Sequence, residues 1–384
     1  SVDPIPEKSD RLFAVQLDSY GTEVRYGTED GLHHQITYQD AMNLFQSDIP
    51  TRQTRLLKSG AAITEESGAV APFMSTVRLC DSDFFSLFNL EFIHGSSWKS
   101  TIDQDAEFVT VISESTSERV FGNINAVGKT LLLDQRAYTV IGVVKDYQPV
   151  PFFYDMVTGK FQYAEGIFIP FSLIPDTQPQ VWGNIQSWRD EKINRYADTL
   201  NSEFLWILYW VELDDAQHQS EYSGYLNAYI QEQKGYGRFE KDAPHGSIKD
   251  VVQWIKYNEV ISDDDKVLVG LGFLFLLACL INTIGLLLAK LHSNTVQAGI
   301  RRALGASRFD LNYQFLVEVG LIGIAGGVFG LALTWAGLEG LSSVYHTYDD
   351  VARFDMFMVA VIFFTAICST LLAGFLPVLK VCRT

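Results

Sequence analysis

The stretch Val267–Ala289, VLVGLGFLFLLACLINTIGLLLA, divides the chain into two regions of different character. Its 23 residues carry no charge. As a helix rising about 1.5 Å per residue it would extend for roughly 34 Å, which exceeds the hydrocarbon core of a bilayer, about 30 Å thick. It is too long and lies too late in the chain to be a signal peptide. A buried core helix of this length would usually carry a polar face, so a membrane-spanning helix is predicted.

Two further apolar stretches follow it. The first contains a single charge, Glu318, and the second contains none and ends before Pro377, a residue that stops or breaks a helix. An acidic loop at 339–355 separates them. The sequence therefore predicts an α-helical membrane domain over 263–384, with spans at about 267–289, 313–338 and 356–376.

The two regions also differ in charge. Of the 29 Lys and Arg residues only seven follow residue 266, and of the 46 Asp and Glu residues only six do, so the first region carries a net charge of −18 and the second +1. A strongly acidic surface disfavours nucleic acid and anionic lipid as partners. It is compatible with cationic ligands, although solubility alone also accounts for it.

The basic residues predict the orientation in the membrane. The connection 290–312 has four basic residues and one acid, and the tail has Lys380 and Arg383, whereas the loop 339–355 has four acids and Arg353. Basic loops stay in the cytoplasm. We therefore expect 290–312 and the C-terminus to be cytoplasmic, and the large first region to lie on the periplasmic or extracellular side of a bacterial inner membrane.

The first region, 1–262, reads as an α+β domain in two lobes. Thr37-Tyr-Gln-Asp40 predicts a helix start, Ser113 and Gly122 predict a helix start and end, and Asp134–Ala137 predicts a hairpin turn. Residues 175–203 lack a clear period and are read as an insertion or long loop. Strands are expected at 11–17, within 56–77, and at 130–133, 138–144, 167–171 and 205–213. Helices are expected at 37–45, 83–88, 113–122, 214–233 and 247–257, with Ser262–Asp265 capping the apolar span.

Sequence motifs for catalysis or metal binding are weak. Gly122–Thr130 resembles a phosphate loop, but five residues rather than four separate its glycines, and a helix is expected before it and a strand after it. His33 and His34 have no partner at metal-ligand spacing, and no H-E-x-x-H, C-x-x-C or G-x-S-x-G pattern occurs. Cys80 is alone in the first region, so no disulfide framework is possible there. No catalytic, cofactor-binding or metal site is therefore predicted in this chain.

The segment Ser293–Asp310, SNTVQAGIRRALGASRFD, is the most informative polar stretch. Its apolar residues recur at helical spacing and form one face, Gly305 ends the helix, and Ser307 starts the next one. The apolar face contains Val296, Ile300, Ala303 and Leu304, and the other side contains Gln297 and Arg301. Such a short amphipathic helix suits either the lipid surface or contact with a cytoplasmic protein.

Small residues in the second span indicate close helix packing. Gly323 and Gly327 form one G-x-x-x-G pair, and Gly326 and Gly330 form another. Glycines at this spacing allow two helices to approach closely. Packing within the same chain and a dimer contact both fit the pattern.

Three stretches of the chain together resemble a known family. Gln297–Leu311, QAGIRRALGASRFDL, followed by a Gly-rich span, resembles the MacB/FtsX-type permeases of ABC transporters. Val77–Gly95 and Val109–Val144 are similar to segments of that family's extracytoplasmic domain. The resemblance implies four transmembrane helices, with the large domain between the first and second. The first would precede Ser1, which also would explain how the domain is exported without a signal peptide in this sequence.

The resemblance also implies partners and a function. The chain would be a permease subunit that couples ATP hydrolysis to export or extraction of an extracytoplasmic substrate, with ATP and Mg²⁺ bound by a cytoplasmic ABC ATPase. It would pair with itself or a paralogous permease, and work with a periplasmic adaptor and an outer-membrane channel. A non-transporting scaffold or sensor that relays ATPase motion to an extracytoplasmic enzyme or a kinase is the alternative. The expected ATPase contact comprises Val296, Gln297, Ile300, Arg301, Arg302, Leu304 and Gly305.

Overall fold

The computed structural model separates into two compact units, residues 1–260 and 261–384, which we call the N-terminal domain and the C-terminal helical region. The structure describes residues 3–22, 26, 28, 30–65, 70–162, 164–259, 263–293, 300–301, 303–305, 307–344 and 359–371.

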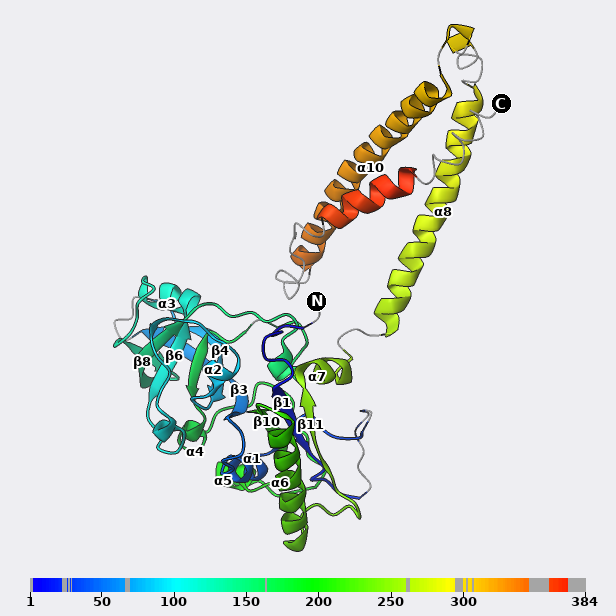
Figure 1. Ribbon diagram of the computed structural model, residues 1–384. Coiled ribbons are helices and arrows are strands. Elements are labelled where there is room, and N and C mark those ends of the chain that lie inside the picture. The colour runs from blue at the N-terminus through cyan, green and yellow to red at the C-terminus, as the bar shows by residue number, and fades with distance from the viewer. Residues whose placement is uncertain are drawn as a thin grey trace. The chain divides into compact units, whose positions relative to one another are not determined.

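The N-terminal domain is built on one mixed sheet (Figure 1). Its main path runs β11-β1-β10-β3-β4-β9-β6-β8-β5, with β2 beside β10 and β7 bridging β3 and β8. The strands are β1 (Leu12–Leu17), β2 (Ile36–Thr37), β3 (Arg52–Glu65), β4 (Phe73–Cys80), β5 (Phe92–Gly95), β6 (Val109–Ser113), β7 (Thr130–Leu133), β8 (Arg136–Val144), β9 (Ile167–Pro170), β10 (Leu205–Glu212) and β11 (Gly246–Asp250).

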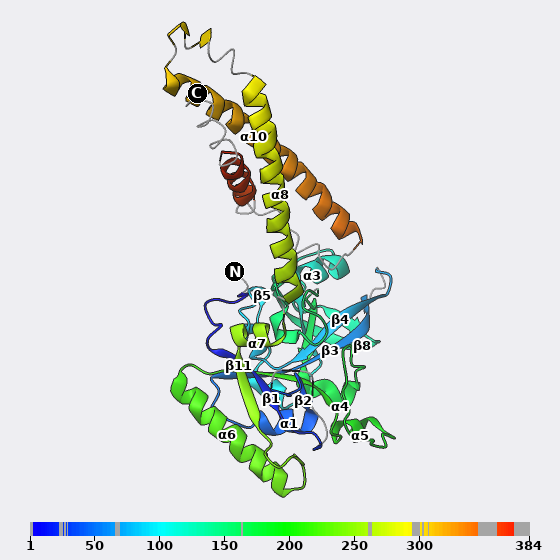
Figure 2. The same ribbon diagram turned by 90° about the vertical axis from the view of Figure 1, so that its right-hand side faces the viewer.

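Helices lie on both faces of this sheet. Figure 2 shows α6, the longest helix of this domain, alongside β11. The α-helices are α1 (Tyr38–Leu44), α2 (Phe84–Leu87), α3 (Glu114–Phe121), α4 (Ile174–Thr177), α5 (Tyr196–Leu200), α6 (Ala216–Gly235) and α7 (Val251–Tyr257). The 3₁₀ helices are η1 (Ser100–Asp103), η2 (Phe153–Asp155) and η3 (Phe171–Leu173).

Two hydrophobic cores, one on each face, explain the composition of the strands. Along β1, Phe13 and Val15 belong to the core that contains α1 and α6, whereas Leu12 and Ala14 belong to the core that contains α2 and α7. Side chains of a strand alternate between faces, so a strand covered on both sides is apolar throughout. This is why β10, LWILYWVE, reads as a continuous apolar run and is buried along its whole length.

Local signals in the sequence are confirmed where they depend on neighbouring residues. The Thr37 hydroxyl accepts from the Asp40 N–H at the start of α1. At the start of α3 the Ser113 hydroxyl accepts from the Thr116 N–H, and that helix ends at Gly122 with φ +62°. Asp134 and Gln135 adopt φ +47° and +68° between β7 and β8, as a tight hairpin turn requires.

Two expectations need correction. The helix predicted from Ser247 begins only at Val251, because the residues before it form β11 and pair with β1, and Asp250 rather than Ser247 caps the helix. The segment 175–203 is not wholly irregular: α4 ends within it and α5 lies near its end. The predicted cap at Ser262 lies outside the described residues.

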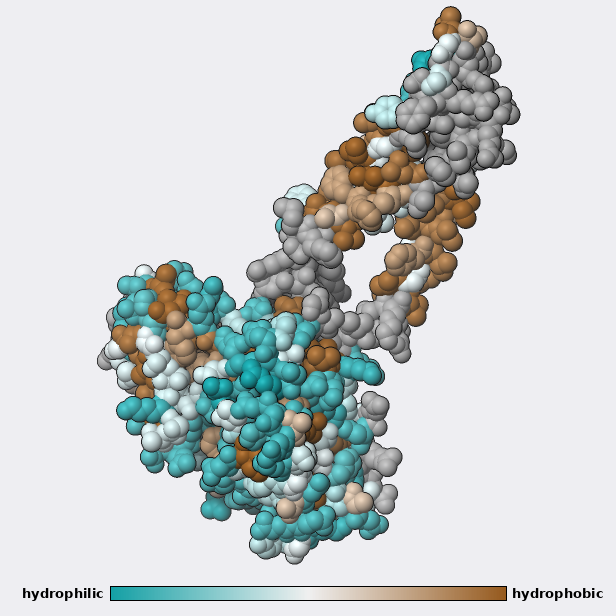
Figure 3. Space-filling view, in the orientation of Figure 1, coloured by the Kyte–Doolittle hydropathy of each residue, from teal (hydrophilic) through white to brown (hydrophobic). Residues whose placement is uncertain are grey.

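The C-terminal helical region contains α8 (Asp263–Ser293) and α10 (Arg308–Val344). Each includes a stretch long and apolar enough to cross a membrane, at Val267–Leu286 and Val317–Gly340. A shorter apolar helix, Val359–Leu371, lies within the third predicted span, whose remaining residues are not described. Figure 3 shows apolar surface over the described parts of α8 and α10, whereas the visible face of the N-terminal domain is mostly hydrophilic.

Candidate functional site

The predicted coupling segment is described only in part. α8 ends at Ser293, Ile300 and Arg301 are helical, and Gly305 adopts φ +100° in the turn before α10. The Leu304 N–H donates to the Ile300 carbonyl over 3.0 Å, so one helical turn precedes the glycine. Val296, Gln297 and Arg302 lie outside the described residues.

The described side chains of this segment are accessible. Ile300 is 57% exposed and Leu304 is 83% exposed. Arg301 donates to the side chain of Gln314 in the first part of α10. The segment therefore presents two apolar side chains beside an arginine, which suits docking of another protein but does not by itself identify one.

The glycines of α10 have different surroundings. A side chain at Gly323 would meet Thr370, and one at Gly327 would meet Phe363, both on the helix Val359–Leu371. Among the described residues, no atom would lie within 4 Å of a Cβ at Gly326 or Gly330. The first pair of glycines thus faces a helix of the same chain, and the second pair faces open space in the described part.

The helix that leads out of the N-terminal domain, α7, is held firmly in its core. The Trp254 indole N–H donates to the Phe153 carbonyl over 3.0 Å, and its ring lies edge-on to Trp210 at 6.0 Å between centroids. Lys160 donates to the carbonyl of Glu259, the last described residue before α8, over 2.6 Å. α7 and the residues that follow it are therefore attached to the packed part of the N-terminal domain.

A second group of contacts fixes the end of α7. The Tyr257 hydroxyl donates to Asp30 over 2.6 Å, and Lys249 forms an ion pair with the same carboxylate at 2.5 Å. The Lys249 ammonium also lies 4.2 Å from the centroid of the Tyr257 ring. Lys249 is on β11, so strand and helix are tied together through Asp30.

The two adjacent histidines belong to this part of the fold. The His34 ring lies against Trp254 and Tyr257, with centroids 5.3 and 5.6 Å apart. Burial lowers the pKa of both His33 and His34 to about 4, so both are neutral near pH 7. In the described part of the chain no group of three His, Cys, Asp or Glu side chains could hold a metal ion.

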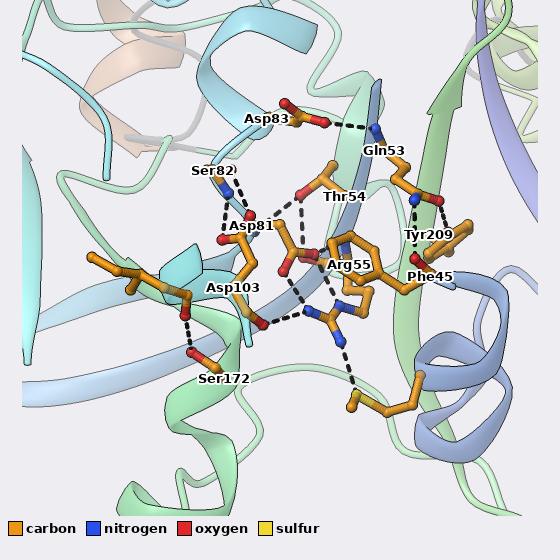
Figure 4. Close-up of polar contacts among 12 residues, drawn as sticks. Phe45, Gln53, Thr54, Arg55, Asp81, Ser82, Asp83, Asp103, Ser172 and Tyr209 are labelled. Carbon is orange, nitrogen blue, oxygen red and sulfur yellow. Dashed lines mark hydrogen bonds and ion pairs between the residues drawn. The ribbon is translucent and has the colours of Figure 1, made fainter. Parts of the chain in front are cut away.

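A buried ion pair lies where β3 passes from one partner strand to the next (Figure 4). The Arg55 Nε and Nη2 atoms donate to both oxygens of Asp81 at 3.0 and 2.6 Å, and the guanidinium lies 3.8 Å from the Phe45 ring centroid. Its Nη2 also reaches the Asp103 carbonyl at 3.3 Å. The pair therefore links β3, α1 and η1 at the centre of the sheet.

The side chain of Asp103 completes this cluster. It accepts from the Ser82 N–H at 2.8 Å, from the Ser82 hydroxyl at 2.5 Å and from the Trp98 indole at 2.9 Å. Burial, together with the nearby Asp81 carboxylate, nevertheless raises the pKa of Asp103 to about 7. These bonds tie the end of η1 to the residue that follows β4 by two positions, so we assign the cluster a structural role.

A second buried cation sits on β4. Arg78 is fully buried, pairs with Asp155 at 2.7 Å and also contacts Glu165. The Tyr154 hydroxyl donates to Glu165 over 3.1 Å. Sequence reasoning missed both buried arginines, since an arginine in a strand gives no sign of whether its partner is solvent or a carboxylate far along the chain.

The phosphate-loop-like segment is a turn between a helix and a strand. α3 precedes Gly122, and β7 begins at Thr130. A phosphate loop needs the opposite order, with the helix after the loop. The geometry therefore agrees with rejecting a nucleotide site here.

Both regions match known families. The MacB-like periplasmic core domain matches residues 2–223, and the FtsX-like permease C-terminal domain matches residues 269–384. The first match alone covers more than half of the chain. The resemblance predicted from the sequence is thus confirmed.

Curated relatives are longer than this chain. The macrolide export ATP-binding/permease protein MacB of Salmonella paratyphi A is 26% identical over 260 residues, which cover 66% of this chain and 34% of the relative. The pyoverdine export ATP-binding/permease protein PvdT of Pseudomonas fluorescens is 22% identical over 390 residues, which cover 99% of this chain and 52% of the relative. The chain therefore spans about a third to a half of these proteins.

Solved structures also align with part of this chain. The periplasmic region of MacB from Actinobacillus actinomycetemcomitans aligns with a TM-score of 0.41 and 16% identity, over 64% of this chain and 92% of that one. The extracellular domain of the ABC-type transporter YknZ from Gram-positive bacteria aligns with a TM-score of 0.39 and 11% identity, over 62% of this chain and all of that one.

Proposed function

This chain belongs to the MacB/FtsX-type permeases of ABC transporters, and from that premise we propose that it transmits ATP-driven motion across the membrane to export or extract a substrate on the far side. The observation that carries the proposal is that both domains of this family occur in one chain, in the order that joins a large domain to apolar helices. The chain itself is then the permease, and a cytoplasmic ABC ATPase supplies the ATP hydrolysis and binds the Mg²⁺.

In the proposed topology the spans at 267–289, 313–338 and 356–376 all cross the inner membrane. The N-terminal domain is periplasmic, and 290–312 and the C-terminus are cytoplasmic, as the distribution of basic residues favours. A further helix before Ser1 would complete the four spans implied by the family. We also propose that the N-terminal domain has two lobes, divided at β3 near Arg55; the change of its pairing from β10 to β4 supports this division.

The proposed path of motion runs from the coupling segment to the sheet. The ATPase would press on the segment around Ile300, Arg301 and Leu304, whose described side chains are exposed. α8 would carry the displacement across the bilayer. α7, fixed through Trp254 and Glu259, would deliver it to the N-terminal domain.

The partners follow from the same proposal. The relatives are named as ATP-binding/permease proteins, which supports an ATPase partner, either as a separate chain or fused before Ser1. We further propose pairing with a second copy or a paralogue, and cooperation with a periplasmic adaptor and an outer-membrane channel. Gly326 and Gly330, which face open space in the described part of α10, are candidates for the contact between copies.

The test is charge reversal at the coupling segment. The full-length protein, reconstituted with its ATPase, should lose transport while the ATPase keeps its basal rate when Arg301 and Arg302 are both changed to Glu. The control is Arg353→Glu, in the loop predicted on the opposite side of the membrane, which should leave coupling intact. Unchanged transport in the double variant would contradict the coupling role.

The same reconstituted preparation distinguishes the relay alternative from transport. If the complex hydrolyses ATP and the N-terminal domain changes conformation, but no substrate from a membrane extract moves, a scaffold that drives an extracytoplasmic enzyme or a kinase is favoured. Co-purification from membranes then identifies that partner.

A further inference from the structure

One edge of β3 is left without a strand partner over part of its length. On that edge β10 pairs as far as Leu56, and β7 pairs only from Ile63 onward. On the opposite edge β4 is paired continuously between Leu57 and Ile63. Within the described part of the chain, no strand fills the gap in between.

The chain fills two of the three hydrogen-bonding positions in this gap by other means. The Trp182 N–H donates to the Lys58 carbonyl over 2.9 Å. The Asp134 N–H donates to the Ala62 carbonyl over 3.0 Å, and the Ala62 N–H donates to the Asp134 carboxylate over 2.8 Å. Lys58 and Ala62 are therefore capped by loop residues in place of a strand.

The position between them, Gly60, is open. Every second residue of a strand directs its N–H and C=O to the same edge, so Gly60 directs both toward the gap, as Lys58 and Ala62 do. Outside the β-ladder, no described residue accepts from the Gly60 N–H, and the Ser59 hydroxyl lies 3.5 Å from its carbonyl oxygen, at the limit for a hydrogen bond. Among the described residues, the hydrogen-bonding position of Gly60 on this edge of β3 is thus unfilled.

A cavity of about 280 Å³ lies at this position. Buried apolar side chains, including Leu79, Leu133 and Ile169, contribute to its lining. The exposed side chains of Asp134 and Arg136 lie in the same lining, so a cation and an anion are both present at the rim. The cavity combines backbone polarity, an apolar interior and charged groups, as ligand sites do.

The insertion 175–203 shapes this cavity. The ring of Trp182 lies directly against Gly60, so that any side chain at position 60 would collide with it. Gln180 also belongs to the lining, and its carbonyl accepts from the Ser59 hydroxyl over 2.7 Å. The insertion therefore covers the β3 edge while leaving the Gly60 rung open.

We propose that this cavity binds a short extended peptide segment. The backbone N–H and C=O of one residue would complete the rung at Gly60, which is how an extended peptide adds to an exposed sheet edge. An apolar side chain would enter the lining around Leu133 and Ile169. The volume is just below the range of about 300–1,000 Å³ typical of small-molecule sites, so the site accepts one apolar side chain with its adjoining backbone rather than a folded partner. This binding is independent of the proposed coupling to an ATPase.

The probe is the capped tripeptide acetyl-Val-Leu-Val-amide, joined to a fluorophore by a flexible linker. Fluorescence polarisation measures its binding to the full chain in lipid nanodiscs. We expect saturable binding that weakens by about tenfold when the central amide nitrogen is methylated, since one backbone hydrogen bond is lost. The methylated peptide leaves the protein untouched, so loss of folding cannot explain the difference.

Protein variants locate the site. Trp182→Ala should weaken binding by at least about tenfold, since the ring lies against Gly60 and forms part of the cavity lining. Trp188→Ala is the matched control, because Trp188 lies in the same insertion but against Gly21 rather than Gly60. The proposal is overturned if no saturable binding occurs, if the methylated and parent peptides bind equally, or if both tryptophan variants lose binding to the same extent.

Discussion

The N-terminal domain and the C-terminal helical region place their apolar side chains in opposite ways. In the first, Trp210 on β10 is fully buried, whereas in the second Phe275 on α8 is 73% exposed. None of the apolar stretch Val267–Leu286 is buried in the structure. The difference teaches that the two regions are built for different solvents: one removes apolar surface from water, and the other offers it to lipid.

The same contrast holds for polar groups. The N-terminal domain buries Arg55 and Arg78 and pairs each with carboxylates, whose opposite charge offsets the cost of burying the cation. α8 has no charge between Val267 and Leu286, and its backbone hydrogen bonds are made within the helix. An open rung such as that at Gly60 is possible only in the region exposed to water.

The largest expected effect breaks the buried charge cluster of β4. Arg78→Met should lower the free energy of unfolding by about 3–5 kcal/mol, because Asp155 and Glu165 would stay buried without their cation. Urea unfolding followed by tryptophan fluorescence measures it, since six of the seven tryptophans lie in the N-terminal domain.

The matched control for this cluster is Arg189→Met, whose partner Glu240 is solvent-accessible and 3.7 Å away. It should leave the unfolding curve almost unchanged. If the two variants had equal free energies of unfolding, water would have to reach the carboxylates of the Arg78 cluster.

The next test places one charge in each region. Leu277→Lys, near the middle of α8, should raise the apparent free energy of membrane insertion by about 3 kcal/mol, because a lysine at the centre of a span is costly. A translocon insertion assay with a glycosylation reporter measures it. Met74→Lys, at a side chain 59% exposed on β4, should change the stability of the N-terminal domain by less than about 0.5 kcal/mol. If Met74→Lys strongly destabilised the N-terminal domain and Leu277→Lys did not hinder membrane insertion, the assignment of α8 to lipid and of Met74 to water would be wrong.

A smaller effect is expected from the glycines of α10. Gly323→Leu should destabilise the helical region by about 1–3 kcal/mol, because the new side chain would collide with Thr370. Gly326→Leu meets no described atom within 4 Å and should leave the thermal unfolding midpoint in detergent unchanged. If Gly326→Leu instead reduces cross-linking between copies, its face forms the contact between them.

A last expected effect concerns pH. The pKa of Asp103 is about 7 in the folded chain, above its unfolded value of about 3.9. Between these values the folded state holds a proton that the unfolded state has released, so this group lowers stability as pH rises from about 4 to about 7. Asp103→Asn should remove that slope, a change of about 4 kcal/mol in the free energy of urea unfolding across the range, since one pKa unit corresponds to about 1.4 kcal/mol. An unchanged slope would show that Asp103 is ionised throughout.

The elements that sequence reasoning predicted well depend on neighbours along the chain. Thr37 and Ser113 cap α1 and α3 through residues three positions away, and the β7–β8 turn needs only Asp134 and Gln135 in left-handed backbone. The family resemblance at Gln297–Leu311 is likewise carried by contiguous residues, and both family matches confirm it. The predicted start of α7 is wrong because residues 247–250 pair with the strand β1, and β1 lies more than 200 residues earlier in the sequence.

By itself the sequence determined that the chain has an acidic mixed α/β part and an apolar helical part, because charge and periodicity are properties of consecutive residues. Only the tertiary structure decided which charges are buried together, how α7 is fixed to the sheet through Trp254, and where β3 runs without a partner. These features join residues that lie far apart in the sequence. One example is the hydrogen bond from the Trp254 indole N–H to the Phe153 carbonyl, which joins residues 101 positions apart. Pairing at that separation depends on the whole folded sheet, which no local pattern encodes.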